Sequence, residues 1–413
     1  MTSAAKQLLS PGRALELVLE RVRPLPAEPV ALPDALGRVL ASGIASADDV
    51  PGFDNSAMDG FAVRSADIRE ARADRPVTLR LRGESRAGRP ASVALEGADA
   101  IRISTGAMVP EGADAVVRKE DAREHGESVE ILEAATPGKE IRRAGEDIAA
   151  EETVLEAGTV LGPAELGVIA SVGVSEVSCA QRPRVVVLTT GDELVEPGTP
   201  LGPGQIRNSN YYAVSAQAGQ AGAHVVDAQV VPDSYETTVN AIAAGLKYDV
   251  LIVCGGVSVG EHDHVKQAFA ELGAEEVFWG LALRPGHPTW FGVGPAHEDE
   301  RDRTLVFGLP GNPVSAMITF HLFARPALLA LMRTDARPRR ATAVMDEPYA
   351  KRPGRAHVVR CRLEQRQDGW HVRPTKAQGS HVLTSMLDAE ALALLDVERG
   401  DVVPGERVEI ELL

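Results

Sequence analysis

Four short apolar runs alternate with helical segments in the second half of the chain. The runs cover residues 185–188, 225–231, 250–253 and 305–307. Helical spacing of apolar residues is found between and after them, at residues 211–221, 236–246 and 263–272 and from Asn312 onward. Strands that alternate with helices typically form a parallel sheet covered on both faces. The pattern therefore predicts an α/β domain over residues 183–335.

The first half shows a different pattern, in which apolar and polar residues alternate over short stretches. Residues 77–82 and 129–132 alternate in this way, and residues 101–107 and 115–120 lie between them. Half-buried strands give this period of two. We predict a β-rich inserted domain over residues 52–139.

The segments on either side of the insertion are assigned by their local signals. Ser10 and Pro11 are typical of a helix start, so residues 1–23 should hold an amphipathic helix that packs on the central domain. Residues 24–51 and 140–182 are predicted to form a connecting domain. Alternation returns at the C-terminal end, so residues 336–413 should form a small β-barrel.

Composition narrows the class of protein. At 413 residues and 44% hydrophobic residues, the chain is long enough for about three packed domains. Its net charge of −16 would repel a nucleic-acid backbone, so we expect no nucleic-acid partner. The most apolar helix, residues 314–332, carries His321, Arg325 and Pro326, and we expect no membrane span.

Cysteine usage and the N-terminus bear on location. Cys179, Cys254 and Cys361 are odd in number and lie far apart, which indicates reduced thiols in a cytoplasmic protein. No charged segment followed by an apolar one opens the chain, so no secretory signal is predicted.

A glycine loop follows the third apolar run. Gly255, Gly256 and Gly260 come directly after residues 250–253, and Glu261 and Asp263 follow. Bare amides and nearby carboxylates could hold a phosphate and the hard cation that accompanies it. The alternative is a tight turn with no ligand.

Carboxylates also follow the neighbouring strands. Asp192 and Glu193 follow the first strand, Asp233 the second and Asp263 the third, while the fourth ends in Pro310-Gly311-Asn312-Pro313 before a helix. Because ligands of parallel sheets bind beyond the carboxyl ends of the strands, this rim is a candidate site for an anion with Mg²⁺. Solvated loop residues or helix caps are the alternative. Zinc at His262-Asp263-His264 is disfavoured, because these residues offer few ligands and no thiolate.

Seven motifs then occur in a specific order. They are Phe53-Asp-Asn-Ser-Ala-Met-Asp-Gly-Phe61, Thr105-Gly-Ala, Gly112-Ala-Asp-Ala-Val-Val117, Gly145-Glu-Asp-Ile148, Thr190-Gly-Asp-Glu-Leu194, Gly255-Gly-Val-Ser-Val-Gly260 and Gly308-Leu-Pro-Gly-Asn-Pro-Val-Ser315. As an ordered set, they closely resemble the molybdopterin molybdenumtransferases, the MoeA family that includes the gephyrin E domain. The resemblance runs from about residue 10 to the end.

The resemblance implies a homodimer of four-part subunits with a three-layer α/β/α molybdopterin-binding domain at the centre. Members of this family take adenylylated molybdopterin and molybdate, cleave the pyrophosphate linkage with Mg²⁺, and release AMP. A transient contact with the molybdopterin adenylyltransferase is also implied. The family's cleft lies between the inserted domain of one subunit and the central and C-terminal domains of the other.

Site residues are carried over position by position. The resemblance implies catalytic roles for Asp59, Thr105, Asp147, Glu193, Asp233 and Asp263, of which Glu193, Asp233 and Asp263 would hold the metal. It implies substrate contacts for Gly255, Gly256, Ser258, Arg284, His287, Pro310, Pro313, Arg360 and Ser380. Molybdate or water could attack the phosphate, so the protein need not supply a nucleophile.

One segment departs from the family pattern. Where relatives usually carry lysines, this chain has Gly280, Arg284 and His287. Arg284 keeps a permanent charge, whereas His287 is cationic only when protonated, so molybdate use should weaken as the pH rises through its titration. A His287→Lys variant should lose this dependence. The alternative is that Lys266, Arg360 or Lys376 binds the oxyanion.

Three other functions remain open. One is a non-catalytic cofactor-binding scaffold, as in the gephyrin branch, although this chain has no fused second domain or long linker. Another is a pterin adenylyltransferase that shares only the central domain, and the segment from Phe53 to Phe61 argues against it. The third is a tungsten-inserting relative, because tungstate and molybdate are nearly the same size and charge.

Overall fold

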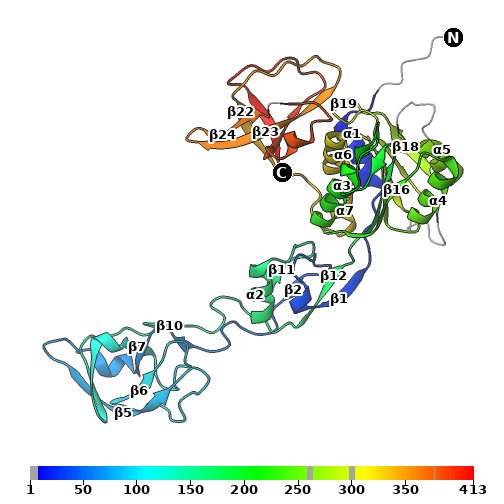
Figure 1. Cartoon of the computed structure of the whole chain (residues 1–413). Coiled ribbons are helices and arrows are strands. Elements are labelled where there is room, and N and C mark those ends of the chain that lie inside the picture. Colours follow the sequence, from blue (N-terminus) through cyan, green and yellow to red (C-terminus); the bar gives the residue numbers. More distant parts are fainter. Residues whose placement is uncertain (1–7, 258–263, 297–302, 376) are drawn as a thin grey trace.

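The computed structural model describes residues 8–257, 264–296, 303–375 and 377–413. The chain is elongated (Figure 1), with the inserted β region at one end and the α/β region with the C-terminal β region at the other. A narrow connecting part joins them. The multidomain fold class predicted from the sequence is confirmed.

The central sheet has the order β16-β13-β17-β21-β20-β18. Its strands are β13 (Arg184–Thr190), β16 (His224–Val231), β17 (Val250–Cys254), β18 (Glu275–Trp279), β20 (Trp290–Val293) and β21 (Leu305–Leu309). The four strands predicted from the apolar runs are parallel. Two further strands, β20 and β18, add an antiparallel edge that the apolar runs did not predict. The segment between β18 and β20 contains no crossover helix. A parallel pair would need such a crossover, so the two strands pair antiparallel.

Helices cover both faces of this sheet. On one face α4 (Tyr235–Gly245) and α5 (His264–Glu271) pack over Val186, Leu251 and Val306. On the other face lie α3 (Ser209–Gln220), α6 (Pro313–Thr319), the π-helical turn Phe320–Ala324 and α7 (Arg325–Leu331). Alternate residues of β13 and β17 enter the two cores, as expected of strands buried on both sides. The domain is therefore a three-layer α/β/α structure.

The N-terminal helix α1 (Pro11–Arg21) joins the second of these cores through Ala14 and Val18. Its start is stabilised by Ser10, whose hydroxyl accepts a hydrogen bond from the Arg13 amide at 3.3 Å. The helical stretch Pro313–Leu331 is long and apolar enough to cross a membrane by composition alone. Because 67% of its most apolar window is buried, it fits a core helix.

The C-terminal region is a closed five-stranded barrel, as predicted. It is formed by β22 (Arg340–Met345), β23 (Ala356–Arg366), β24 (Gly369–Pro374), β25 (Ala391–Leu395) and β26 (Arg407–Leu412). A short strand of the central region, β19 (Leu283–Arg284), pairs with the start of β23. This pairing ties the barrel to the loop between β18 and β20.

The inserted region holds a six-stranded sheet in the order β7-β4-β6-β5-β9-β8. These strands are β4 (Gly60–Val63), β5 (Val77–Ser85), β6 (Asp99–Ile103), β7 (Ala115–Arg118), β8 (Ala122–His125) and β9 (Ser128–Ile131). Short pairs complete the chain: β1 (Ala27–Ala31) with β12 (Glu176–Ala180), β2 (Ile44–Ala45) with β11 (Thr153–Leu155), β3 (Asn55–Ser56) with β10 (Ile141–Arg142), and β14 (Leu194–Val195) with β15 (Ile206–Arg207). Helix α2 (Pro163–Ser171) packs on the connecting part, and 3₁₀ turns lie at Leu32–Asp34, Ser65–Ile68, Lys119–Asp121 and Leu383–Met386.

Candidate functional site

A cavity of about 340 Å³ lies where the barrel meets the central domain. It brings together Arg284, His287 and Ser380, three of the predicted substrate contacts, from separate parts of the chain. Two backbone hydrogen bonds hold its walls together: the Val314 amide donates to the Ser380 carbonyl at 3.1 Å, and the Ala356 amide donates to Ala282 at 2.8 Å. The site therefore depends on the docking of the two domains.

Other lining residues were not predicted as contacts. They include Asn312, Ser315, Arg355, Gln378 and His381. Asn312 was predicted only as a helix cap. It does precede α6, but its side chain makes no capping hydrogen bond. Its place inside the Pro-Gly-Asn-Pro turn was the signal that could have identified it.

The charge of this cavity is one-sided. Arg284 and Arg355 are exposed arginines on its lining, and no carboxylate occurs among the described lining residues. The net charge of the whole chain is −16, so a cavity lined by arginines without carboxylates differs from the rest of the protein. A concave positive site attracts anions.

Arg360 adds a buried positive charge behind the lining. Its side chain is fully buried on β23, and Nη2 donates to the carbonyls of Ala377 at 3.1 Å and Gly379 at 3.4 Å. Within the described chain, Nε and Nη1 have no hydrogen-bond partner and no carboxylate pairs with this guanidinium. Burial lowers the pKa of Arg360 from its usual value. A buried cation without a counterion is costly, and a bound anion would relieve that cost.

Gln378 links Arg360 to the lining. Its amide oxygen accepts from the Arg360 backbone amide at 3.1 Å, and its nitrogen donates to the Arg360 carbonyl at 2.9 Å. The same nitrogen also donates to Thr375. Residues 377–380 are thus fixed over Arg360, and Ser380 with them.

His357 lies beside Arg284 in the β19–β23 pairing. Its Nδ1 is 3.1 Å from the Tyr349 hydroxyl. Burial lowers the pKa of His357 to about 4, and the nearby charge of Arg284 acts in the same direction. The ring is therefore neutral near pH 7, and the permanent charges on the lining of the 340 Å³ cavity are those of Arg284 and Arg355.

The acidic rim lies at the carboxyl ends of the parallel strands. The Asp233 amide donates to Asp192 Oδ1 at 3.0 Å, and the Asp192 amide donates to Asp233 Oδ2 at 3.4 Å. The exposed carboxylate of Glu193 instead lies against Gly191. No group of three or more acidic, histidine or cysteine side chains suited to a metal occurs among the described residues. Asp263 and Ser258 lie outside the described residues.

The turn at Pro310 and Pro313 connects the rim to the cavity. A Cβ added at Gly311 would lie 3.7 Å from Gly255 Cα, while Asn312 next to it lines the cavity. Gly255 and Gly256 have φ of +97° and +64°, and a Cβ at Gly255 would be 2.8 Å from Thr190 Oγ1. These glycines are therefore required by the packing of their own chain, whatever else they contact.

Thr105 follows β6 and Asp147 follows β10, two strands that Figure 1 shows at the inserted end of the chain, and Asp59 is hydrogen-bonded to Thr105. Asp59 Oδ1 accepts from the Thr105 amide at 2.8 Å and from its hydroxyl at 3.1 Å, and the amide bond in particular lowers the pKa of Asp59. Asp147 is exposed. Within a single chain, these three residues therefore lie apart from the other candidate site residues.

Asp54 occupies a related position that was not among the predicted site residues. Its carboxylate accepts from the Ala144 amide at 2.9 Å and from Arg143 at 2.5 Å. The Ala144 amide is the larger of these two causes that lower the pKa of Asp54. Exposed Phe53, Met58 and Met108 occur in the same part of the chain.

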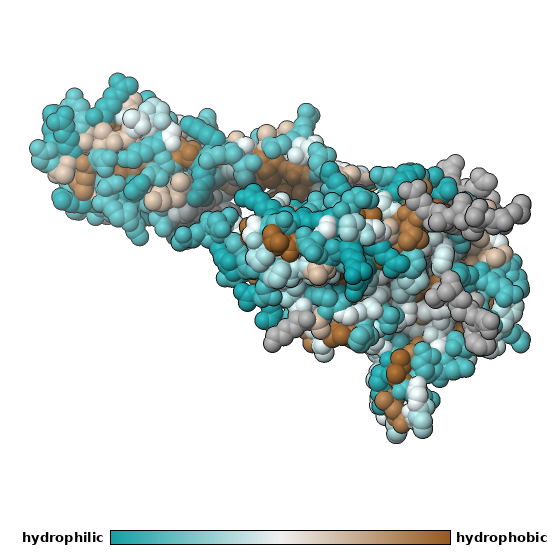
Figure 2. All heavy atoms as spheres, turned by 90° about the horizontal axis from the view of Figure 1, so that it is seen from above, coloured by the Kyte–Doolittle hydropathy of each residue, from teal (hydrophilic) through white to brown (hydrophobic). Residues whose placement is uncertain are grey.

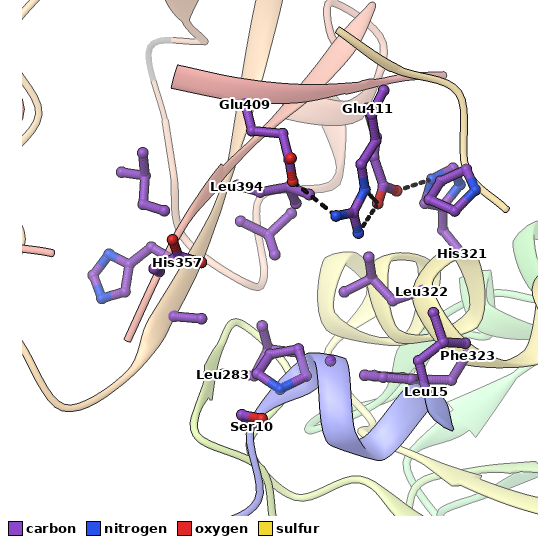
Figure 3. A pocket seen from close by; sticks show the side chains of 18 of the residues that line it. Ser10, Leu15, Leu283, His321, Leu322, Phe323, His357, Leu394, Glu409 and Glu411 are labelled. Atoms are coloured by element: carbon purple, nitrogen blue, oxygen red, sulfur yellow. Dashed lines mark hydrogen bonds and ion pairs between the residues drawn. The ribbon is translucent and has the colours of Figure 1, made fainter. Parts of the chain in front are cut away.

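A second cavity, of about 300 Å³, lies between α1, the helical stretch that follows α6, and the barrel. Figure 3 shows carboxylates of Glu409 and Glu411 on one side and the apolar side chains of Leu15 and Phe323 on the other. Arg340 pairs with Glu409 at 2.8 Å and with Glu411 at 3.1 Å, and Glu411 also meets His321 Nε2 at 3.1 Å. None of the predicted site residues lines it.

Comparisons with known proteins agree with this architecture. Residues 9–173 match the MoeA N-terminal region (domain I and II), residues 186–330 a probable molybdopterin binding domain, and residues 342–413 the MoeA C-terminal region (domain IV). These matches, on this fold, define a multidomain protein of the molybdopterin-binding class.

Individual relatives are similar over nearly the whole chain. A molybdopterin molybdenumtransferase from Haemophilus influenzae is 37% identical and covers 98% of each chain. Molybdopterin molybdenumtransferase 2 from Mycobacterium tuberculosis is 40% identical over 83% of this chain and 86% of its own. The crystal structure of the molybdopterin biosynthesis MoeA protein from Pyrococcus horikosii has a TM-score of 0.83 at 31% identity, covering 98% and 99% of the two chains. The chain belongs to the MoeA family of molybdopterin molybdenumtransferases. Membership supports a transferase with a role in molybdenum cofactor biosynthesis.

Proposed function

We propose that this protein inserts molybdenum into adenylylated molybdopterin and releases AMP. The observation that carries this proposal is the unmatched positive charge of the 340 Å³ cavity, backed by buried Arg360. Molybdate is a tetrahedral dianion, and guanidinium groups with a nearby hydroxyl suit such an oxyanion. Arg284, Arg360 and Ser380 would hold it at the junction.

The turn that contains Asn312 links this cavity to the acidic rim, and the substrate would span the two. The pterin phosphate would meet backbone amides and the start of α6 at the rim. The dithiolene sulfurs would then reach toward the oxyanion. The three cysteines are buried, and burial raises the pKa of Cys254 to about 12, so the sulfur ligands come from the substrate.

Mg²⁺ fits the donor set of the rim. Asp192 and Asp233 face each other and each has a carboxylate oxygen outside the mutual hydrogen bonds. Mg²⁺ typically takes one or two carboxylates and completes its shell with water and phosphate oxygens. When bound, it would neutralise phosphate charge as the pyrophosphate linkage breaks. Glu193 and Asp263 stay candidate ligands from the resemblance.

The protein would work as a homodimer in the cytoplasm. Asp59, Thr105 and Asp147 lie too far along one chain to join the cavity of that chain, so a second copy would supply them. Mixing Asp59→Asn chains with Arg360→Met chains tests this arrangement. Random exchange makes half of the dimers hybrid with one intact site of two, so activity should recover to about a quarter of the wild-type value. No recovery, in mixtures shown to contain hybrids, would contradict a shared site.

The decisive experiment measures AMP release from adenylylated molybdopterin with molybdate. Release should require both molybdate and Mg²⁺, and chelation of Mg²⁺ should stop it. A cofactor-binding scaffold would instead bind the substrate and release no AMP. A tungsten-inserting enzyme would prefer tungstate over molybdate, and the adenylyltransferase would consume ATP. A passing contact with that adenylyltransferase would deliver the substrate.

A further inference from the structure

One ring nitrogen of His287 is hydrogen-bonded to the protein backbone. Its Nδ1 lies 2.8 Å from the Leu281 carbonyl oxygen. A carbonyl only accepts hydrogen bonds, so Nδ1 carries a hydrogen whether the ring is neutral or charged. Protonation can therefore change only Nε2.

The loop around His287 is fixed by its backbone. The Gly280 amide donates to Thr289 at 3.0 Å, and the amides of Leu281 and Thr289 both donate to the His287 carbonyl at 2.9 Å. Gly286 holds φ of +115° with a Cβ position only 2.5 Å from Thr319 Cγ2, which restricts it to glycine. The loop is thus a rigid support, and the tautomer of His287 does not depend on a mobile partner.

The ring lines the oxyanion cavity, and Nε2 is its remaining polar atom. The cavity lining around it holds two arginines and one other histidine, with no carboxylate among the described lining residues. Lys266 lies 4.6 Å from the centre of the Trp279 ring, whose centre is 6.2 Å from that of His287. Among the residues that the structure describes, the charged or titratable groups around His287 are Arg284, Arg355, Arg360, His381 and Lys266.

Tetrahedral oxyanions differ in one relevant property. Molybdate and sulfate carry no hydrogen near neutral pH and can only accept hydrogen bonds. Hydrogen phosphate keeps an O–H group that can donate. Neutral Nε2 accepts a hydrogen bond and so matches only the second kind, whereas the imidazolium donates and matches both.

We propose that His287 determines oxyanion specificity: its neutral form favours a hydrogen-bearing oxyanion such as hydrogen phosphate, and its charged form favours molybdate. The inference rests on the proposed function, because it takes this cavity as the molybdate site. Discrimination arises when a partly buried acceptor faces an oxygen that has no hydrogen to offer. Arg284 and Arg360 attract both kinds of anion and set affinity instead.

Calorimetric titration of the full chain with molybdate, sulfate and inorganic phosphate at about pH 6 and about pH 8 tests this proposal. Inorganic phosphate itself loses a proton over this range, so the two proteins are compared. The preference for molybdate over phosphate should fall about tenfold more in the wild type than in His287→Lys, the worth of one mismatched hydrogen bond. Sulfate should follow molybdate. The His287→Lys variant should show only the change that the ionisation of phosphate causes.

The possible outcomes separate the two proposals. Equal changes of preference in the wild type and His287→Lys, with molybdate bound and lost in Arg360→Met, overturn the role of His287 alone. If His381→Gln, rather than the His287 variant, removes the extra change seen in the wild type, the pH dependence belongs to His381, which also overturns it. If neither anion binds, or Arg360→Met leaves binding unchanged, the oxyanion cavity itself is wrong.

Discussion

The two cavities at the junction between the central domain and the barrel differ in how their charges are matched. In the cavity of Figure 3, Arg340 meets Glu409 and Glu411, and His321 completes the group. In the other, Arg284, Arg355 and buried Arg360 have no described carboxylate on the lining. Paired charges suffice to hold two domains together. Unpaired buried charge is tolerated where a ligand supplies the counterion, so the cavity lined by Arg284 and His287, and not that of Figure 3, has the character of a binding site.

Replacing Arg360 with methionine should give the largest effect on activity. We expect molybdate-dependent AMP release to fall at least about 100-fold, which corresponds to about 2.7 kcal/mol of lost stabilisation. Stability should not fall, since the substitution removes a buried unmatched charge. Steady-state kinetics and thermal unfolding measure the two effects. A large loss of stability with intact turnover would make Arg360 a structural residue.

Arg340→Met is the matched variant in the paired cavity and should show the opposite result. It leaves the Glu411 carboxylate, only 2% exposed, with His321 as its remaining partner. Because Arg340 itself is 45% exposed, we expect a moderate loss of about 1–3 kcal/mol and a Tm lower by about 2–6 °C. Turnover at saturating molybdate should stay within about twofold. A fall in activity as large as that of Arg360→Met would contradict the claim that only one of the two cavities binds the substrate.

His357 gives the smallest expected effect; it lines the cavity of Figure 3 and pairs with Arg284, which lines the other. Its folded pKa of about 4 lies below the unfolded value, so the unfolded chain binds more protons between about pH 6.5 and pH 4. Stability from this group is therefore lost as the pH falls through that window. His357→Gln should flatten the fall of Tm by a few degrees, with exposed His224→Gln as control. Parallel pH profiles for His357→Gln and wild type would show that His357 is not buried as a neutral group.

Figure 2 shows why surface hydropathy would not have located the site. The visible face is mostly hydrophilic, and its hydrophobic residues lie in small separate groups. The observation that identified the site was the set of cationic side chains without a carboxylate partner. That signal exists only once side chains from distant segments have been placed together.

The sequence predicted the elements well where one local rule dominated. The apolar runs of the parallel strands, the Ser10-Pro11 helix start and the alternation of the barrel strands each follow from a single periodicity. It failed at β18 and β20, whose short edge strands carry little pattern and depend on the neighbour they pair with. The limits of the domains stay predictions.

Motif order determined the family from the sequence alone, because the required residues are encoded locally and in series. It also nominated Arg284, His287, Arg360 and Ser380 one by one. Only the tertiary structure decided that three of them line one cavity with Arg355 and His381, and that the fourth lies buried behind it, with no counterion in the described parts of the chain. Likewise, the acidic residues of the rim could be identified from the sequence. Only the structure shows that Asp192 and Asp233 are hydrogen-bonded to each other and that the Glu193 carboxylate lies against Gly191. Whether a charged side chain has a partner of opposite charge depends on the distances between segments that are remote in the sequence. No local sequence pattern contains this information.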